Sequence, residues 1–159
     1  MTEPAFDELL RRLVAAEARF VVVGGLAVGA WGVVRGTKDV DIVVSPEPGN
    51  LRRIADVAVA VGGHIQRGEA LLGTPISIAA ALAGGKQVPI ETDLGRLDVV
   101  QGLDGIPSFG QLQARAIEAE ILGVTVMVCS IEDLKAMKRA AGRTRDLADL
   151  EDLEAARDQ

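Results

Sequence analysis

Apolar positions follow two different periods along the first third of the chain. Apolar residues that recur three and four positions apart predict amphipathic helices, and short β-branched runs predict buried strands. These patterns predict helices over residues 6–14, 26–34 and 50–61 and strands over residues 20–23 and 40–44. Asn50 is the predicted N-cap of the third helix, because its side chain can accept a hydrogen bond from a free helical amide.

The pattern is weaker in the middle of the chain, where glycine-bearing turns separate short apolar runs. The predicted strands from there onward cover residues 75–78, 87–90, 96–100 and 124–128. Residues 76–83 fit a helical turn equally well. The stretch around Pro107 shows no regular period, so no element is predicted there.

Two helices are predicted to close the chain. Ser130 and Asp133 have the spacing of a capping box for the first, Gly142 ends it, and Thr144 caps the second. The mixed order of helices and strands predicts an α+β fold, a small mixed β-sheet with flanking helices and a C-terminal helical pair. At 159 residues the chain fits one domain, residues 1–159, with residues 130–159 as a C-terminal helical extension.

The composition of the chain limits the cellular environment and the binding partners that can be predicted for it. Cys129 is the single cysteine, so an intramolecular disulfide is excluded and a reducing cytoplasm is predicted. The longest apolar run, residues 20–34, contains four glycines and falls short of a membrane span. The net charge of −6 disfavours nucleic-acid binding by the whole surface but allows a local basic patch.

Candidate chemistry begins at Gly24-Gly25, between a predicted strand and the helix that follows it. Glycines let the backbone turn tightly and let a ligand approach the amide groups closely. The start of a helix offers free N–H groups to a phosphate. This turn therefore predicts a phosphate contact, although strand-Gly-Gly-helix turns also occur for steric reasons alone.

Two carboxylates lie on the next predicted strand. Asp39 and Asp41 are two positions apart, so they project from the same side of the strand, among apolar neighbours. Their mutual repulsion would be offset by a divalent cation, and Mg²⁺ prefers a few carboxylates together with substrate phosphates. The alternative is a pair of solvated acids at the exposed start of a strand.

A third acid would complete a metal site. Asp98 precedes Val99-Val100 on a predicted strand and is the best candidate. Glu91 and Asp93 fall where a turn is expected, and Asp104 follows a glycine in a predicted loop.

Basic residues gather on the first closing helix. Lys135 shares a helical face with both Lys138 and Arg139, and this face is predicted to border the acids. The bland interpretation is dipole matching, in which cations gather at a helix C-terminus and the acids that follow gather at the next N-terminus.

Residues 22–44, with Gly-Gly, Arg35, Thr37 and Asp-Val-Asp-Ile, resemble the signature of the DNA polymerase β-type nucleotidyltransferase superfamily. The closing stretch 133–149 is similar to the tail of small bacterial members, including the abortive-infection toxin nucleotidyltransferases. The resemblance implies a nucleotidyl transfer that uses two Mg²⁺ ions, or Mn²⁺. Asp39 and Asp41 would hold the ions that bind a nucleoside triphosphate such as ATP. Asp98 would hold the second ion and help to deprotonate the acceptor hydroxyl.

The resemblance also assigns Gly24 and Gly25 to the β- and γ-phosphates. Many members carry a serine after the first glycine, whereas this chain has Gly25. Contacts to the triphosphate must then come from the backbone or from a basic side chain. The candidates are Arg35, Lys38 and Lys138.

Other functions fit some of the same residues. A dinucleotide-binding fold also has a strand, a glycine turn and a helix, but its G-x-G-x-x-G spacing is absent and the acids precede their strand's apolar run. A non-catalytic nucleotide- or partner-binding module, such as one half of a toxin–antitoxin pair with a cognate antitoxin, is the second alternative. Within the enzyme class the acceptor could be tRNA or other RNA, a protein hydroxyl, or a small molecule such as an aminoglycoside.

Overall fold

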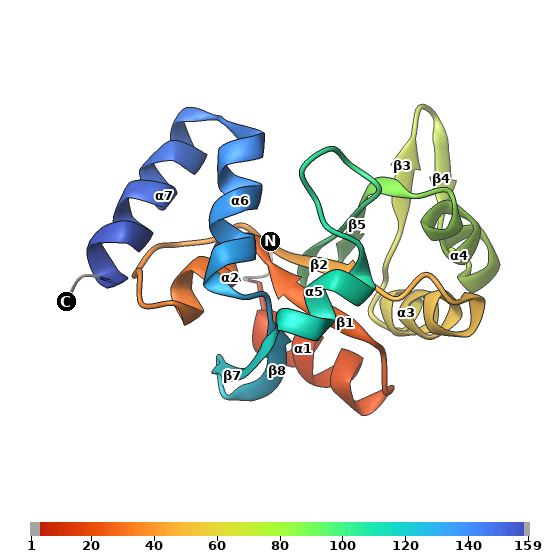
Figure 1. Ribbon diagram of the computed structural model, residues 1–159. Coiled ribbons are helices and arrows are strands. Elements are labelled where there is room, and N and C mark those ends of the chain that lie inside the picture. Colours follow the sequence, from red (N-terminus) through yellow and green to blue (C-terminus); the bar gives the residue numbers. More distant parts are fainter. Residues whose placement is uncertain (1–3, 158–159) are drawn as a thin grey trace.

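The computed structural model describes residues 4–157 and is built around one six-stranded mixed sheet (Figure 1). Along the chain the strands are β1 Phe20–Val23, β2 Asp39–Val44, β3 Ile65–Arg67, β4 Ala70–Leu72, β5 Lys86–Thr92, β6 Gly95–Gln101, β7 Ile117–Ile121 and β8 Val124–Val128. The helices are α1 Phe6–Ala15, α2 Gly24–Ala30, α3 Pro48–Ala60, α4 Pro75–Ala83, α5 Phe109–Arg115, α6 Ile131–Ala141 and α7 Thr144–Arg157.

The sheet has the strand order β5-β6-β2-β1-β8-β7. β2 pairs antiparallel with β1 and parallel with β6, and β1 pairs parallel with β8. The outer strands β5 and β7 pair antiparallel with β6 and β8. This mixed sheet with flanking helices, closed by the pair α6–α7, confirms the predicted α+β class.

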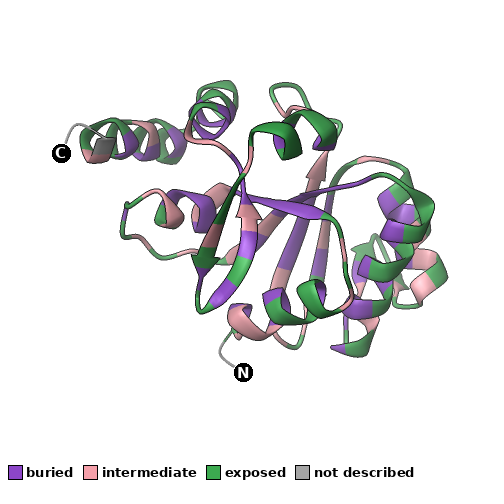
Figure 2. Ribbon diagram, turned by 60° about the horizontal axis from the view of Figure 1, so that its bottom comes forward, coloured by how far each residue is buried: buried purple, intermediate pink, exposed green. Residues whose placement is uncertain are grey.

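The core lies between this sheet and the helices that cover it (Figure 2). Val40, Ile42 and Val44 alternate along β2 and are fully buried on the side opposite Asp39 and Asp41. On the amphipathic helix α1 the residues Phe6, Leu9, Leu10 and Leu13 are buried. The neighbouring strands β2 and β6 both lie inside the sheet and carry the candidate acids.

The predicted strand at residues 75–78 is wrong, and the helical alternative is right. Thr74 caps α4 with a reciprocal capping box to Ser77, and Pro75 occupies the first turn, where its missing N–H costs nothing. The short hairpin β3–β4 and the elements α5 and β7 had no regular apolar period and were not predicted.

Two predicted helix boundaries also differ. α3 begins at Pro48, so Asn50 is not its N-cap. The Asn50 side chain is buried in the first turn, where it accepts from the Arg19 amide (2.7 Å) and donates to the carbonyls of Arg19 (3.0 Å) and Ser45 (2.9 Å). α2 ends at Ala30, just before Gly32 with a φ of 100°.

The C-terminal helices pack beside α2, at one side of the sheet (Figure 1). The basic and acidic residues after residue 130 lie on these helices, which bring them near the end of β1 and the start of β2. Over residues 4–157, none of the helices combines the length and the apolar character that crossing a membrane would require.

Candidate active site

The three candidate acids meet at the centre of the sheet. The parallel register of β2 and β6 pairs Asp41 with Asp98 and Asp39 with Arg96. One carboxylate oxygen from each of Asp39, Asp41 and Asp98 lies within 4.8 Å of the other two. Asp98 is 3% exposed, and the other two acids are half-buried. The strand alternation predicted from sequence and the register of two distant strands together build this cluster.

The negative charge of the cluster is only partly balanced by the protein. Asp98 accepts hydrogen bonds from Arg96 (3.3 Å) and from the Gln87 amide (3.2 Å). Burial, and next the charges of Asp39 and Asp98, raise the pKa of the Asp41 carboxyl to about 7. Burial is also the main cause that raises the pKa of Asp98. Three converging carboxylates, two of them with raised pKa values, form a donor set that suits a hard divalent cation, because such an ion would offset both the repulsion and the burial.

The Gly24-Gly25 turn lies directly beside Asp41. Val23, the last residue of β1, pairs with Asp41 in the antiparallel register, so the turn begins next to this carboxylate. Gly24 has a φ of 67°, and a Cβ there would overlap the carboxylate of Asp41. A Cβ on Gly25 would lie 2.7 Å from the Thr37 hydroxyl. The two glycines therefore allow the turn to approach Asp41 and Thr37 more closely than residues with side chains could.

Replacing Gly24 should reveal this close approach. We expect Gly24→Ala to destabilise the protein by about 2 kcal/mol or more, since it adds left-handed strain and displaces Asp41. Gly29→Ala is the matched control on the same helix, because a Cβ there meets nothing within 4 Å. Urea unfolding of both variants measures the effect. Equal stabilities for Gly24→Ala and Gly29→Ala would contradict the packing of the turn against Asp41.

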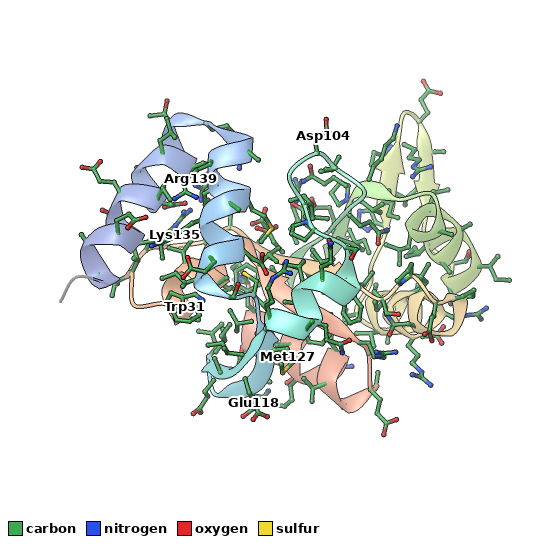
Figure 3. All side chains as sticks on the ribbon, viewed as in Figure 1. Trp31, Asp104, Glu118, Met127, Lys135 and Arg139 are labelled. Atoms are coloured by element: carbon green, nitrogen blue, oxygen red, sulfur yellow. The ribbon has the colours of Figure 1, made fainter. Side chains whose placement is uncertain are left out.

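A cavity of about 350 Å³ opens over the acids and the glycine turn. Its walls include all three acids, both glycines, Arg35, Thr37, Lys138, Arg143, Arg145 and Asp146. The loop between β6 and α5 closes one side, and Asp104 stands at its tip (Figure 3). Lys38 is exposed and does not line this cavity, so the structure does not bring it to the acids.

Of the three basic residues predicted to border the acids from α6, only Lys138 lines the cavity. The Lys135 ammonium is buried against α7, 3.1 Å from Glu154, and Arg139 lies 3.8 Å from the same carboxylate (Figure 3). Neither Lys135 nor Arg139 lines the cavity over the acids. The prediction that these two residues border the acids is wrong, because the acidic face of α7 lies against their side of α6.

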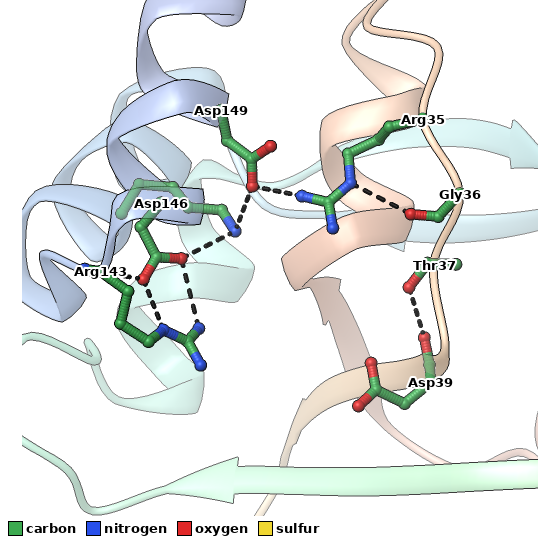
Figure 4. A network of polar contacts seen from close by, with 8 residues as sticks. Arg35, Gly36, Thr37, Asp39, Arg143, Asp146 and Asp149 are labelled. Atoms are coloured by element: carbon green, nitrogen blue, oxygen red, sulfur yellow. Dashed lines mark hydrogen bonds and ion pairs between the residues drawn. The ribbon is translucent and has the colours of Figure 1, made fainter.

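Acids of α7 hold the cations that do face the cavity (Figure 4). Lys138 lies 3.3 Å from Asp146 and 3.0 Å from Asp149, and Arg35 forms an ion pair with Asp149. Arg143 donates to Asp146 at 2.7 Å. Asp146 and Asp149 are 1% and 5% exposed, so their pairs with Lys138 and Arg35 are buried, whereas Arg143 binds Asp146 from an exposed position.

The pKa of Asp146 agrees with its role as an ion-pair partner of Lys138 and Arg143. Burial alone would raise its pKa, but hydrogen bonds from Arg143 and Lys138 outweigh burial and lower it. Dipole matching thus does not account for Asp146 and Asp149. The sequence interpretation missed that these acids position Arg35, Lys138 and Arg143. The available signal was the three-residue spacing of Asp146 and Asp149, which places both on one helical face.

Comparison with known proteins places the chain in a family. A family model described as "Nucleotidyl transferase of unknown function (DUF2204)" matches residues 2–159. Among curated protein sequences, none matches the chain.

Solved structures share the fold at low identity. The lincosamide antibiotic adenylyltransferase LnuA, in its lincomycin-bound crystal structure, is 14% identical with a TM-score of 0.66 and covers 98% of both chains. The antibiotic-resistance factor ANT(2'')-Ia is 17% identical with a TM-score of 0.59, covering 96% of this chain and 87% of its own. With the match over nearly its whole length and a nucleotidyltransferase fold, the chain belongs to the DUF2204 family of nucleotidyl transferases.

Proposed function

We propose that this protein transfers a nucleoside monophosphate from a nucleoside triphosphate to an acceptor hydroxyl in a reaction that depends on divalent metal ions. The observation that carries the proposal is the cluster of Asp39, Asp41 and Asp98, whose oxygens lie within 4.8 Å of one another beside the Gly24-Gly25 turn. Structural ion pairs would not leave three carboxylates facing one cavity, whereas a metal-dependent transferase requires such a set.

Asp39 and Asp41 would hold metal at the triphosphate, and Asp98 would hold the second ion and accept the proton of the acceptor hydroxyl. Two Mg²⁺ ions, or Mn²⁺, would there supply charge stabilisation for the attacking and leaving oxygens. In the transfer, the acceptor oxygen bonds to the α-phosphorus, and the bond from that phosphorus to pyrophosphate breaks. The bonding pair leaves with the pyrophosphate, and the hydroxyl proton passes to Asp98.

The other residues of the cavity would bind the triphosphate. Gly24 and Gly25 would offer backbone amides to phosphate oxygens beside the acids, because their missing Cβ atoms leave room for Asp41 and Thr37 at the turn. Lys138, Arg35 and Arg143 offer positive charge from the opposite wall, where Asp146 and Asp149 hold them in place. Such charge would help an anionic substrate to enter a site lined by acids, and would stabilise the pyrophosphate as it leaves.

The acceptor is proposed to be a small molecule. The neighbours of similar fold include structures bound to lincomycin and to adenylyl-2''-tobramycin. The net charge of −6 disfavours binding of a large nucleic acid by the whole surface. Toxin-type transfer to tRNA or to a protein, with a cognate antitoxin, is the competing proposal that the same site could serve.

An acceptor assay separates these proposals. Each nucleoside triphosphate, labelled at the α-phosphate, is incubated with the protein and Mg²⁺ together with total tRNA, lysate proteins or a pool of small hydroxylated molecules. We expect label in the small-molecule pool, and none in any pool when EDTA removes the metal. Label confined to tRNA or protein would contradict the proposed acceptor class, and no label with any nucleotide would favour the non-catalytic binding module.

A further inference from the structure

A second, larger cavity lies beside the site over the acids. It is an open cavity with a volume of about 650 Å³, bordered by the end of β2, the end of α4 and the start of α5. Its walls include Val44, Leu51, Ala83, Pro107 and Phe109. No charged side chain lines it among the residues that the structure describes. Small-molecule sites have this size and character, a mostly apolar wall with a few polar groups.

The two cavities adjoin each other. Alternate residues of a strand point to one side, so Val43 lies on the same side of β2 as Asp39 and Asp41, and it lines the apolar cavity. Ile106, in the loop between β6 and α5, lines both cavities. At the end of β6, Val100 lines the cavity over the acids and the next residue, Gln101, lines the apolar cavity from the opposite side of the strand to Asp98. A molecule of drug-like size could therefore fill the apolar cavity and extend to Asp98.

The polar groups of the apolar cavity are few. The Gln101 amide donates to the Leu82 carbonyl at 2.7 Å, so its own oxygen is left to accept from a ligand. The Ser108 hydroxyl accepts a hydrogen bond from the backbone amide of Gln111 at 3.2 Å, so the hydroxyl proton is left to donate to a ligand. A polycation would meet no carboxylate here, and a phosphate would meet no cation. The chemistry of the walls selects an uncharged and largely apolar body with one or two polar groups.

We infer that the apolar cavity binds the body of the acceptor, a small uncharged molecule with an apolar skeleton and a hydroxyl group that reaches Asp98. This inference rests on the proposed nucleotidyl transfer and adds the class of the acceptor. The triphosphate and the acceptor then occupy neighbouring cavities, separated by the loop that carries Ile106.

The binding part of the inference is tested with an uncharged fluorescent probe, N-phenyl-1-naphthylamine. Ala80→Phe fills the apolar cavity from the exposed face of α4, and Ala83→Phe does the same from the end of that helix. Ala148→Phe, on the exposed face of α7, adds the same ring outside the cavities over the acids and beside α4. We expect saturable binding to wild type, an affinity at least about ten times lower for Ala80→Phe and Ala83→Phe, and no change for Ala148→Phe.

The acceptor part is tested by displacement followed by labelling. Uncharged hydroxylated compounds that displace the probe are offered as acceptors with α-labelled nucleotide and Mg²⁺. We expect wild type to label them and Ala80→Phe to raise their apparent KM at least about tenfold without changing the KM for nucleotide.

Each other outcome overturns the inference. Probe binding that is absent, or unaffected by both phenylalanine variants, would show that the cavity holds no such ligand. Displacement of the probe by the nucleotide itself would make the cavity part of the nucleotide site. If other acceptors are labelled but the displacing compounds are not, the acceptor inference fails and the proposed function stands, whereas no transfer to any acceptor defeats both.

Discussion

Asp41→Asn is expected to lower the rate of nucleotidyl transfer by about a thousandfold or more, while making the metal-free protein more stable. The loss of rate follows from the position of Asp41 between the glycine turn and Asp98, where its carboxylate completes the cluster of three acids. The gain in stability follows from the cost of ionising Asp41 in that cluster. A residue needed only for folding would show the opposite change in stability.

The pH dependence gives the stability effect a sign and a window. The pKa of Asp41 is raised from 3.8 to about 7 in the folded protein. Between these two pH values the folded state holds more protons than the unfolded state, so the free energy of unfolding falls as the pH rises from about 4 to about 7. The penalty is at most about 4 kcal/mol above that window. Asparagine does not ionise, so the variant should lose this slope and exceed wild type most clearly at pH 8.

Chemical unfolding of the metal-free proteins at pH 5 and pH 8, together with transfer rates in Mg²⁺, measures both effects. Asp56→Asn is the control, because this exposed acid forms a surface pair with Arg52 on α3, away from the cluster. It should change neither quantity by a measurable amount. Unchanged transfer by Asp41→Asn, or a loss of several kcal/mol at pH 8, would mean that the acid is structural.

Lys138→Ala is expected to cost about 3 kcal/mol of stability and to slow transfer about tenfold or more. Lys138 lies between two buried acids of α7 and also lines the cavity over the candidate metal ligands. Removing it leaves Asp149 with Arg35 alone and withdraws one positive charge from the proposed triphosphate site. Stability and rate should therefore fall together.

Lys135→Ala is the matched control on the same helix. Lys135 is equally buried, but its partner Glu154 is half exposed and the pair lies outside the cavity. Its removal should cost about 1 kcal/mol and leave the transfer rate unchanged once the protein is folded. Rates at several salt concentrations complete the test, since the effect of Lys138 on the KM for nucleotide should shrink as salt rises. If Lys138→Ala and Lys135→Ala transferred at the same rate, α6 would contribute only to folding.

The parts of the site that the sequence predicts are those encoded locally. Asp39 and Asp41 follow from the two-residue period of one strand, and the glycine turn follows from a strand that stops at Gly24. The position of Asp98 is not encoded locally, because its place opposite Asp41 depends on the parallel register of two strands far apart in the chain. An acid ahead of a β-branched run on a predicted strand was enough to choose it from the neighbouring acids.

The parts that the sequence does not predict depend on tertiary contacts. Charges three and four positions apart on α6 look equivalent in sequence, but α7 covers Lys135 and leaves Lys138 at the cavity. Asn50 has the residue type of an N-cap, yet its side chain forms hydrogen bonds to the backbones of Arg19 and Ser45. The helix at Pro75–Ala83 was ambiguous because its residues are nearly all small or apolar, and the capping box that the N-cap Thr74 forms with Ser77 fixes its start.

The account is tested most directly by following two labels on one nucleotide. The triphosphate carries label at the α-phosphate in one reaction and at the γ-phosphate in another, each with Mg²⁺ and with an acceptor found in the assay above. The account predicts that wild type moves the α label to the acceptor and releases the γ label in pyrophosphate, and that Asp41→Asn or EDTA stops both. Transfer of the γ label to the acceptor, or undiminished transfer by Asp41→Asn, would contradict it.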